Sequence, residues 1–207
     1  MLARSQKNIK SLISPSPQIP IYLDLIMKQI ILVTGGSRSG KSEWAENIAI
    51  NSNKSVIYIA TAMVDSTDQE WQARIAKHQQ RRPEDWSTIT EHKNLDLVIN
   101  QALKEQCLLI DSLGTWVANF LELEVNDWQQ ITDKFLDSLE NAQGTIILVG
   151  EETGWGIVPA YKSGRIFRDR LGHLTRQIGA IADTAYLVVG GHVLNLNVLG
   201  TPLKIDP

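Results

Sequence analysis

The sequence predicts an α/β protein in which a mostly parallel β-sheet is flanked by helices. Short apolar runs rich in β-branched residues alternate along the chain with longer stretches of helical periodicity. The last two apolar runs surround Gly190-Gly191, a dipeptide that suits a hairpin, so antiparallel strands are expected at the C-terminal end. The length of 207 residues suits a single domain of this class with a substantial core.

Each element follows from its local composition. Strands are expected at 29–34, 55–60, 107–111, 145–149, 185–189 and 193–198, where β-branched and other apolar residues cluster. Helices are expected at 43–50, 95–104, 113–123, 128–141 and 164–182, and the polar stretch 68–81 is also helix-prone. In the first helix, Trp44, Ile48, Ala45 and Ala49 should form the inner face.

A phosphate-binding motif lies between the first strand and the first helix. The residues Gly35, Gly36, Ser37, Arg38, Ser39, Gly40, Lys41 and Ser42 fit the pattern G-x-x-x-x-G-K-[ST]. Loop N–H groups and the helix N-terminus would bind phosphate, Lys41 would neutralise the β- and γ-phosphates, and the Ser42 hydroxyl would hold Mg²⁺. The alternative is a chance match in a Gly/Ser-rich turn, which the flanking strand and helix disfavour.

The strand at 107–111 ends in an acid. Four apolar residues followed by Asp111 have the form of a Walker B element, whose carboxylate holds Mg²⁺ beside the phosphate loop. The alternative is an ordinary helix N-cap at Asp111 or Ser112. The phosphate loop in the same chain favours the metal. The chain lacks an ABC-type signature and the N-K-x-D motif, so a small-molecule kinase or nucleotidyltransferase is expected rather than a motor, transporter subunit or switch.

Composition limits the classes of binding partner that are expected. Charged residues make up 21% of the chain and the net charge is −3, so no basic excess indicates nucleic acid or an anionic membrane. The single cysteine, Cys107, lies in an apolar run, which excludes a disulfide framework and a cysteine metal cluster. A cytoplasmic location is expected, because a reducing compartment suits such a chain.

The first 26 residues differ from the rest. They are basic and rich in serine and proline, and the apolar run at 21–26 is too short for a membrane span or a good signal core. We interpret residues 1–26 as a disordered tail or an extension from an upstream start before Met27, with a targeting peptide as the alternative. The folded domain is then 27–207, without stable membrane insertion.

A histidine that lies among cationic residues is the next candidate catalytic residue. On a helix, Arg74 and Arg82 each lie one turn from His78 and on its face. Neighbouring cations disfavour the charged imidazole, and the neutral form is the nucleophile. The alternative is a solvated basic helix face with an incidental histidine, which the spacing alone favours.

From about residue 28 to 189 the sequence resembles the bifunctional adenosylcobinamide kinase/adenosylcobinamide-phosphate guanylyltransferase family of cobalamin biosynthesis. The resemblance rests on motifs in order: 31–42 with the phosphate loop, 58–62, Ala73-Arg74-Ile75 with His78 and Arg82-Pro83-x-x-Trp86, Leu109-Ile110-Asp111 with Trp116 and Asn119, Glu151-Glu152-x-Gly154-x-Gly156-Ile157-Val158-Pro159, and Phe167-Arg168-Asp169-x-x-Gly172. The spacing around His78 and the Gly-x-Gly-Ile-Val-Pro segment are its most specific parts.

The resemblance implies roles for individual residues. His78 resembles the histidine that becomes guanylylated, the phosphate loop resembles the nucleotide loop, and Asp111 resembles the strand-end acid. The nucleotide-contacting segments would be Ala60, Thr61 and Ala62, and Gln79, Gln80, Arg81 and Arg82. Glu91 would match a further nucleotide-contacting acid, although the spacing from Trp86 is one residue longer than usual and Thr90 could take that place. Thr175 stands where the family often has Asn and receives no role.

The resemblance also implies the chemistry. A nucleoside triphosphate, ATP or GTP, would phosphorylate adenosylcobinamide with Mg²⁺, and GMP would then pass from GTP through His78 to give adenosylcobinamide-GDP. The implied fold is RecA-like and the implied assembly is a homo-oligomer, trimers being the known form. No protein-bound cobalt or zinc is expected, because cobalt belongs to the substrate and His92, His173 and His192 show no ligand spacing. The alternative functions are a plain P-loop kinase of a small metabolite and a GTP-binding regulatory protein.

Overall fold

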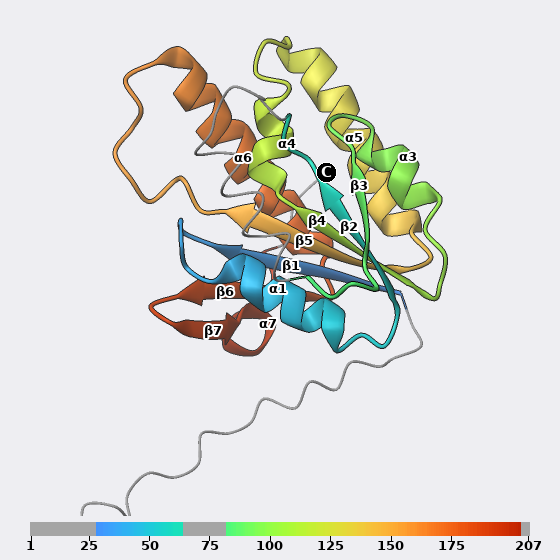
Figure 1. Cartoon of the computed structure of the whole chain (residues 1–207). Helices are drawn as coiled ribbons and strands as arrows, with labels where there is room; N and C mark the ends of the chain where they lie inside the picture. Colours follow the sequence, from blue (N-terminus) through green and yellow to red (C-terminus); the bar gives the residue numbers. More distant parts are fainter. Residues whose placement is uncertain (1–27, 64–81, 204–207) are drawn as a thin grey trace, which may run out of the picture.

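The strands form a seven-stranded sheet with the order β3-β2-β4-β5-β1-β6-β7, as a computed structural model that describes residues 28–63 and 82–203 shows (Figure 1). The strands are β1 (Gln29–Gly35), β2 (Ser55–Ala60), β3 (Ser87–Thr90), β4 (Gln106–Asp111), β5 (Thr145–Glu151), β6 (Thr184–Val189) and β7 (His192–Asn195). Neighbouring strands from β3 to β6 are parallel, and β6 and β7 are antiparallel. The predicted fold class is therefore confirmed.

Helices cover the two faces unequally. The helices are α1 (Lys41–Ile50), α3 (Leu95–Asn100), α4 (Leu113–Ala118), α5 (Val125–Asn141), α6 (Lys162–Ile181) and the short α7 (Leu196–Leu199). In Figure 1, α1 lies against one face, and α3, α4, α5 and α6 lie on the other. Among the described residues, no helix is long and apolar enough to cross a membrane.

The central strands are buried on both faces because helices cover both. Along β1, Ile30 and Leu32 join the core under α3 to α6, whereas Ile31 and Val33 join the core under α1. This alternation follows from the two-residue period of a strand. It explains why the sequence of a central parallel strand is a continuous apolar run.

Two elements differ from the sequence-based expectation. The short strand β3 was not predicted, since its residues Ser-Thr-Ile-Thr are all exposed and carry no apolar run. The predicted strand at 193–198 stops at Asn195, because the Asn195 side chain accepts hydrogen bonds from the N–H groups of Asn197 and Val198 and caps α7 instead. The helices predicted at 95–104 and 113–123 are also shorter, ending at Asn100 and Ala118.

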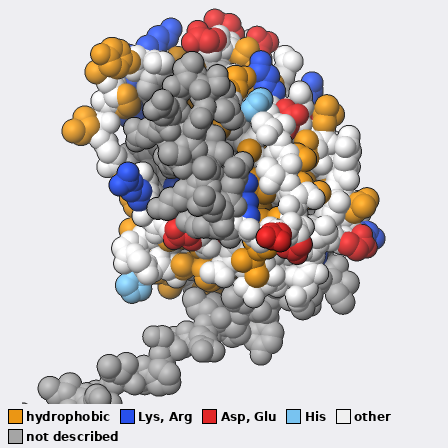
Figure 2. All heavy atoms as spheres, viewed as in Figure 1, with side chains coloured by type: hydrophobic (Ala, Val, Ile, Leu, Met, Phe, Trp, Pro, Cys, Tyr) orange, Lys and Arg blue, Asp and Glu red, His pale blue; other side chains and the backbone are white. Residues whose placement is uncertain are grey.

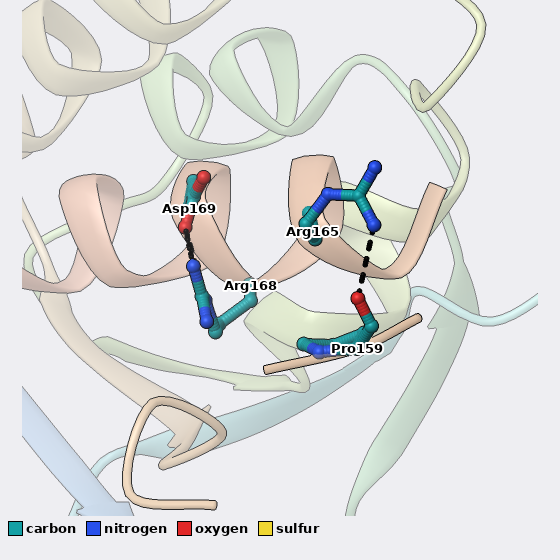
Figure 3. Close-up of polar contacts among 4 residues, drawn as sticks. All are labelled: Pro159, Arg165, Arg168 and Asp169. Carbon is teal, nitrogen blue, oxygen red and sulfur yellow. Dashed lines mark hydrogen bonds and ion pairs between the residues drawn. The ribbon is translucent and has the colours of Figure 1, made fainter. Parts of the chain in front are cut away.

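The segment between β5 and α6 runs from Glu152 to Tyr161 and is attached to the first turn of α6. The Arg165 guanidinium donates to the carbonyl oxygen of Pro159 at 3.0 Å, as Figure 3 shows. Further along α6, Arg168 and Asp169 form an exposed ion pair at 2.8 Å (Figure 3), a kind of contact that adds little stability. The hydrogen bond from Arg165 to Pro159 therefore fixes where the loop enters α6.

Candidate nucleotide site at the carboxyl edge of the sheet

The phosphate loop adopts the backbone that the motif requires. β1 ends at Gly35 and α1 begins at Lys41, with Gly40 at the N-cap in a left-handed conformation (φ 95°). No side chain caps this helix end, so the N–H groups of its first turn remain available for an anion. Arg38 also has a positive φ of 58°, which turns the loop back toward the helix. The loop is therefore shaped as an anion cradle.

Gly35 is required by close packing. A Cβ at this position would lie 2.5 Å from the backbone oxygen of Val188 on the neighbouring strand β6 and 2.6 Å from the Ser39 hydroxyl. Backbone cannot move aside easily, so a side chain would push the loop away from β6. At Gly36, by contrast, an added Cβ would meet nothing within 4 Å.

Lys41 and Ser42 occupy the first turn of α1. Lys41 is only 7% exposed, and its Nζ donates to the carbonyl oxygen of Gly36 at 3.3 Å. Ser42 is half-buried beside it. The Ser39 hydroxyl is buried without a hydrogen-bond partner among the described residues. A buried cation and an unpartnered hydroxyl in one loop are what a bound phosphate would satisfy.

β5 lies between the phosphate-loop strand and the strand that carries Asp111. Gly35 is opposite Glu151 on β5, whereas Asp111 on β4 is opposite Val149, two residues earlier on β5. The carboxylate on the strand adjacent to the loop is therefore Glu151, which sequence analysis listed within a motif without giving it a role. The position of Glu151 at the end of an apolar run is the sequence feature that could have identified it as a site residue.

Glu151 is held in place by the turn after β4. Its Oε2 accepts the N–H of Gly114 at 2.9 Å, and a Cβ on Gly114 would collide with this carboxylate. Burial raises the pKa of Glu151, and the charge of Asp111 adds to the rise. The Ser112 hydroxyl and the charge of Lys41 act in the opposite direction. The carboxylate thus belongs to the same electrostatic cluster as the lysine of the phosphate loop.

A second group of residues, the Asp111 corner, consists of Tyr58, Thr61, Arg82, Asp111 and Ser112. The Tyr58 hydroxyl donates to Asp111 Oδ2 at 3.1 Å, and the Arg82 guanidinium lies 3.2 Å above the centre of the Tyr58 ring. Burial and the neighbouring Asp111 raise the pKa of Tyr58, so its hydroxyl stays protonated and remains a donor. The stack links Arg82, a predicted nucleotide contact, to Asp111.

Thr61 is tied into the fold at this corner. Its Oγ1 donates to the backbone oxygen of Ser112 at 2.7 Å and accepts the N–H of Ser112 at 3.0 Å. The Asn119 amide donates to the backbone oxygens of both Thr61 and His92, each at 2.9 Å. The Thr61 hydroxyl is therefore already hydrogen-bonded within the protein. If the segment Ala60–Ala62 contacts a nucleotide, the contact would come from its backbone or from the methyl groups of the two alanines.

Glu91 follows β3 and starts the turn into α3. Its N–H donates to the oxygen of Ala60 at 3.0 Å, and its Oε1 accepts the N–H groups of Lys93 and Asn94, both at 2.8 Å. Burial pushes the pKa of Glu91 upward, but these hydrogen bonds, together with the charge and the backbone N–H of His92, outweigh burial and lower the net pKa. One oxygen of Glu91 is thereby occupied, whereas Thr90 is an exposed strand residue.

Part of the predicted site lies outside the described residues. This part includes the predicted helix at 68–81 and the candidates His78, Gln79, Gln80 and Arg81. The N-terminal segment 1–26, interpreted as a tail, also lies outside the described residues. The chain is described again from Arg82 onward, beside Asp111.

The donor set of the site suits a magnesium–nucleotide complex. Mg²⁺ prefers oxygen ligands and is usually held by one or two carboxylates together with substrate phosphates. Within 28–63 and 82–203 there is no group of three or more His, Cys, Asp or Glu residues that could hold an ion without such a substrate. The Ser42 hydroxyl and the Asp111 and Glu151 carboxylates are hard oxygen donors at one edge of the sheet, so the residues fit the ion.

Large apolar side chains are exposed beside this edge. Trp155 is 68% exposed and Ile157 is 96% exposed, and both belong to the loop that leaves β5. Figure 2 shows hydrophobic side chains along the left margin of the molecule, where Figure 1 places this loop. An exposed apolar segment next to a polar site indicates a surface that another molecule covers.

Known proteins resemble this chain over most of its length. Residues 31–196 match the model of the family described as cobinamide kinase / cobinamide phosphate guanyltransferase. The bifunctional adenosylcobalamin biosynthesis protein CobU of Escherichia coli (strain K12) is 36% identical over 177 residues, which cover 78% of this chain and 96% of that protein. The corresponding protein CobP of Pseudomonas aeruginosa is 37% identical over 180 residues, which cover 85% of this chain and 98% of that protein. A solved structure from Pyrococcus horikoshii OT3 shares the fold alone, with a TM-score of 0.52 and 8% identity. The match covers 82% of this chain and 86% of that one.

Proposed function

Because the chain belongs to the cobinamide kinase / cobinamide phosphate guanyltransferase family, we propose that one nucleotide-binding edge of its sheet serves both reactions. The protein is a bifunctional transferase of adenosylcobalamin biosynthesis. The observation that carries the proposal is the anion cradle of Gly35–Ser42, with its uncapped helix end and buried Lys41. A cradle of this kind binds the triphosphate that each reaction consumes.

In the kinase reaction, the hydroxyl oxygen of the aminopropanol arm of adenosylcobinamide attacks the γ-phosphorus of the bound triphosphate. The new O–P bond forms as the bond to the β-phosphate oxygen breaks, and the nucleoside diphosphate leaves. The hydroxyl proton passes to solvent or to a carboxylate at the edge of the sheet. Lys41 offsets charge on the β- and γ-phosphates, as in other P-loop enzymes. ATP and GTP both fit this scheme as the phosphoryl donor.

Ser42 and Asp111 would hold the Mg²⁺ that accompanies the nucleotide, with Glu151 as a neighbouring carboxylate. When bound, the ion supplies positive charge to the phosphate oxygens. Tyr58 keeps the Asp111 carboxylate oriented through its 3.1 Å hydrogen bond. Orienting contacts of this kind tune a metal ligand without touching the metal.

In the guanylyl reaction, His78 attacks the α-phosphorus of GTP and pyrophosphate leaves, which gives a histidine phosphoramidate of GMP. The phosphate of adenosylcobinamide phosphate then displaces the histidine and forms adenosylcobinamide-GDP. A neutral imidazole avoids the repulsion between two phosphates that a direct attack would meet. The assignment rests on the sequence motif.

The resemblance to the family supports a homo-oligomer, with a trimer as the expected form. The single cysteine, Cys107, is buried and cannot form a disulfide within the chain, which supports a reducing cytoplasm. Light scattering after gel filtration tests the trimer.

The decisive experiment separates the two activities. Incubation with GTP labelled at the α-phosphate should label the wild-type chain with a bond that is acid-labile and base-stable, as a phosphoramidate is. His78→Ala should lose the label and guanylyl transfer but keep much of the kinase activity, since Lys41 and Ser42 remain. His173→Ala, which removes an exposed histidine of α6, is the matched control and should label normally. Continued labelling of His78→Ala at the wild-type level would favour the rival, a plain P-loop kinase.

A further inference from the structure

A cavity of about 590 Å³ lies at the carboxyl end of β1, on the side of the sheet opposite α1. β1 contributes Leu32 and Thr34 to its wall, and α6 contributes Thr175 and Ala180. Other lining residues include Arg176 of α6, Glu151 at the end of β5, Ala185 of β6, the start of the loop after β5, and residues of the segment after β7 such as Leu199 and Leu203. The mechanism above does not use this space.

The cavity adjoins the phosphate loop. Thr34 directly precedes Gly35, the first residue of the loop. Glu151 lines the cavity and also senses the charge of Lys41, so its carboxylate belongs both to the cavity and to the nucleotide site. A group bound in the cavity would therefore lie next to the phosphates.

The cavity wall carries charged groups on Glu151, Glu152 and Arg176 and hydroxyl groups on Thr34 and Thr175. Thr34 Oγ1 donates to Glu152 Oε1 at 2.6 Å, which fixes the carboxylate and leaves its second oxygen as an acceptor. Thr175 Oγ1 is buried and has no hydrogen-bond partner among the described residues. A buried hydroxyl without a partner costs about 1–3 kcal/mol, a cost that a ligand or a water molecule removes. Most of the remaining wall is apolar.

We propose that this cavity binds the hydroxyl-ended aminopropanol arm of cobinamide, with the hydroxyl on Glu152 and the arm's amide near Thr175. The proposal rests on the kinase function stated above. The arm carries both amide donors and acceptors, which match a carboxylate and a threonine hydroxyl, and its methylene and methyl groups match the apolar wall.

The size of the cavity places the corrin ring outside it. Cavities of roughly 300–1,000 Å³ hold drug-sized ligands, and a complete corrinoid is larger than that class. The exposed Trp155 stands at the wall of the cavity, where a flat apolar ring would contact it.

The test measures binding of dicyanocobinamide by calorimetry without nucleotide, and then the KM for cobinamide and kcat of the kinase reaction. Ala180→Phe fills the cavity, Glu152→Gln removes the acceptor charge, and Thr175→Val removes the hydroxyl at nearly constant volume. Ala180→Phe and Glu152→Gln should weaken binding by about tenfold or more, and Thr175→Val by several-fold. All three should bind a fluorescent GTP analogue as the wild type does. Glu140→Gln, on the exposed end of α5, is the control and should leave both ligands unaffected.

Wild-type affinity and KM for cobinamide in Ala180→Phe would overturn the proposal while leaving the kinase function intact. An altered oligomeric state of that variant, with cobinamide binding unchanged, would overturn it by assigning the cavity to an interface between copies of the chain. If Ala180→Phe fails to fold, unchanged binding in both Glu152→Gln and Thr175→Val decides against the proposal. Failure of the wild type to phosphorylate cobinamide would instead contradict the function on which the proposal rests.

Discussion

The phosphate loop and the Asp111 corner lie at the same edge of the sheet but are constructed differently. The loop is eight consecutive residues whose shape comes from local backbone, with left-handed conformations at Arg38 and Gly40. The corner joins residues from separate segments through side-chain contacts, such as Tyr58 with Asp111 and Thr61 with Ser112.

The two regions therefore differ in how a substitution affects activity. A change within the loop acts directly on the anion cradle, because the binding groups are the loop's own N–H groups and Lys41. A change at the corner acts indirectly, by loosening a carboxylate that other residues hold in place. We therefore expect removal of a binding group of the loop, such as the Lys41 amine, to abolish activity, and changes at the corner to reduce it in part.

The largest effect is expected from Lys41→Ala. Both reactions need a bound triphosphate, so both activities should fall by at least about 10²–10³-fold, the cost of losing one well-placed charge-stabilising group. The kinase and guanylyl transfer rates measure this. Lys134→Ala, which removes an exposed lysine of α5, should behave as the wild type. Normal phosphoryl transfer by Lys41→Ala would show that Gly35–Ser42 is not the site and would break the comparison.

An intermediate effect is expected from Gly35→Ala, compared with Gly36→Ala. The added methyl group at residue 35 meets the backbone oxygen of Val188, whereas at residue 36 it meets open space. Gly35→Ala should lower the free energy of unfolding by about 1–3 kcal/mol and reduce nucleotide binding, whereas Gly36→Ala should keep wild-type stability. Thermal unfolding and nucleotide titration measure the pair. Equal stability of the two variants would contradict the close packing of the loop against β6.

The smallest effect is expected from Tyr58→Phe, which tests the corner. Loss of the hydrogen bond to Asp111 should reduce activity by about tenfold and raise the Mg²⁺ concentration needed for half-maximal rate, because the carboxylate is less well oriented. The free energy of unfolding should fall by about 1 kcal/mol. Tyr161→Phe, at an exposed tyrosine, is the control. An unchanged Mg²⁺ dependence in Tyr58→Phe would mean that Asp111 does not act through the metal.

Much of the fold was predictable from local patterns, and the exceptions have physical reasons. Central strands such as β1 and β4 are apolar runs because both of their faces are covered, and these are the strands that sequence patterns indicate most clearly. The exposed strand β3 has no such pattern. The early end of β7 depends on the Asn195 side chain, which caps α7.

The phosphate loop and the acid that ends β4 follow from the amino-acid sequence, because each depends on residues adjacent in the chain. The alternation of helices and mostly parallel strands also follows from the sequence, because hydrophobic periodicity is local. Other features depend on the folded chain: β5 separates Asp111 from the loop and places Glu151 beside it, Tyr58 and Arg82 meet at Asp111, and Thr61 bonds to Ser112. Strand order and side-chain contacts join residues far apart in the chain, and no short-range pattern encodes them.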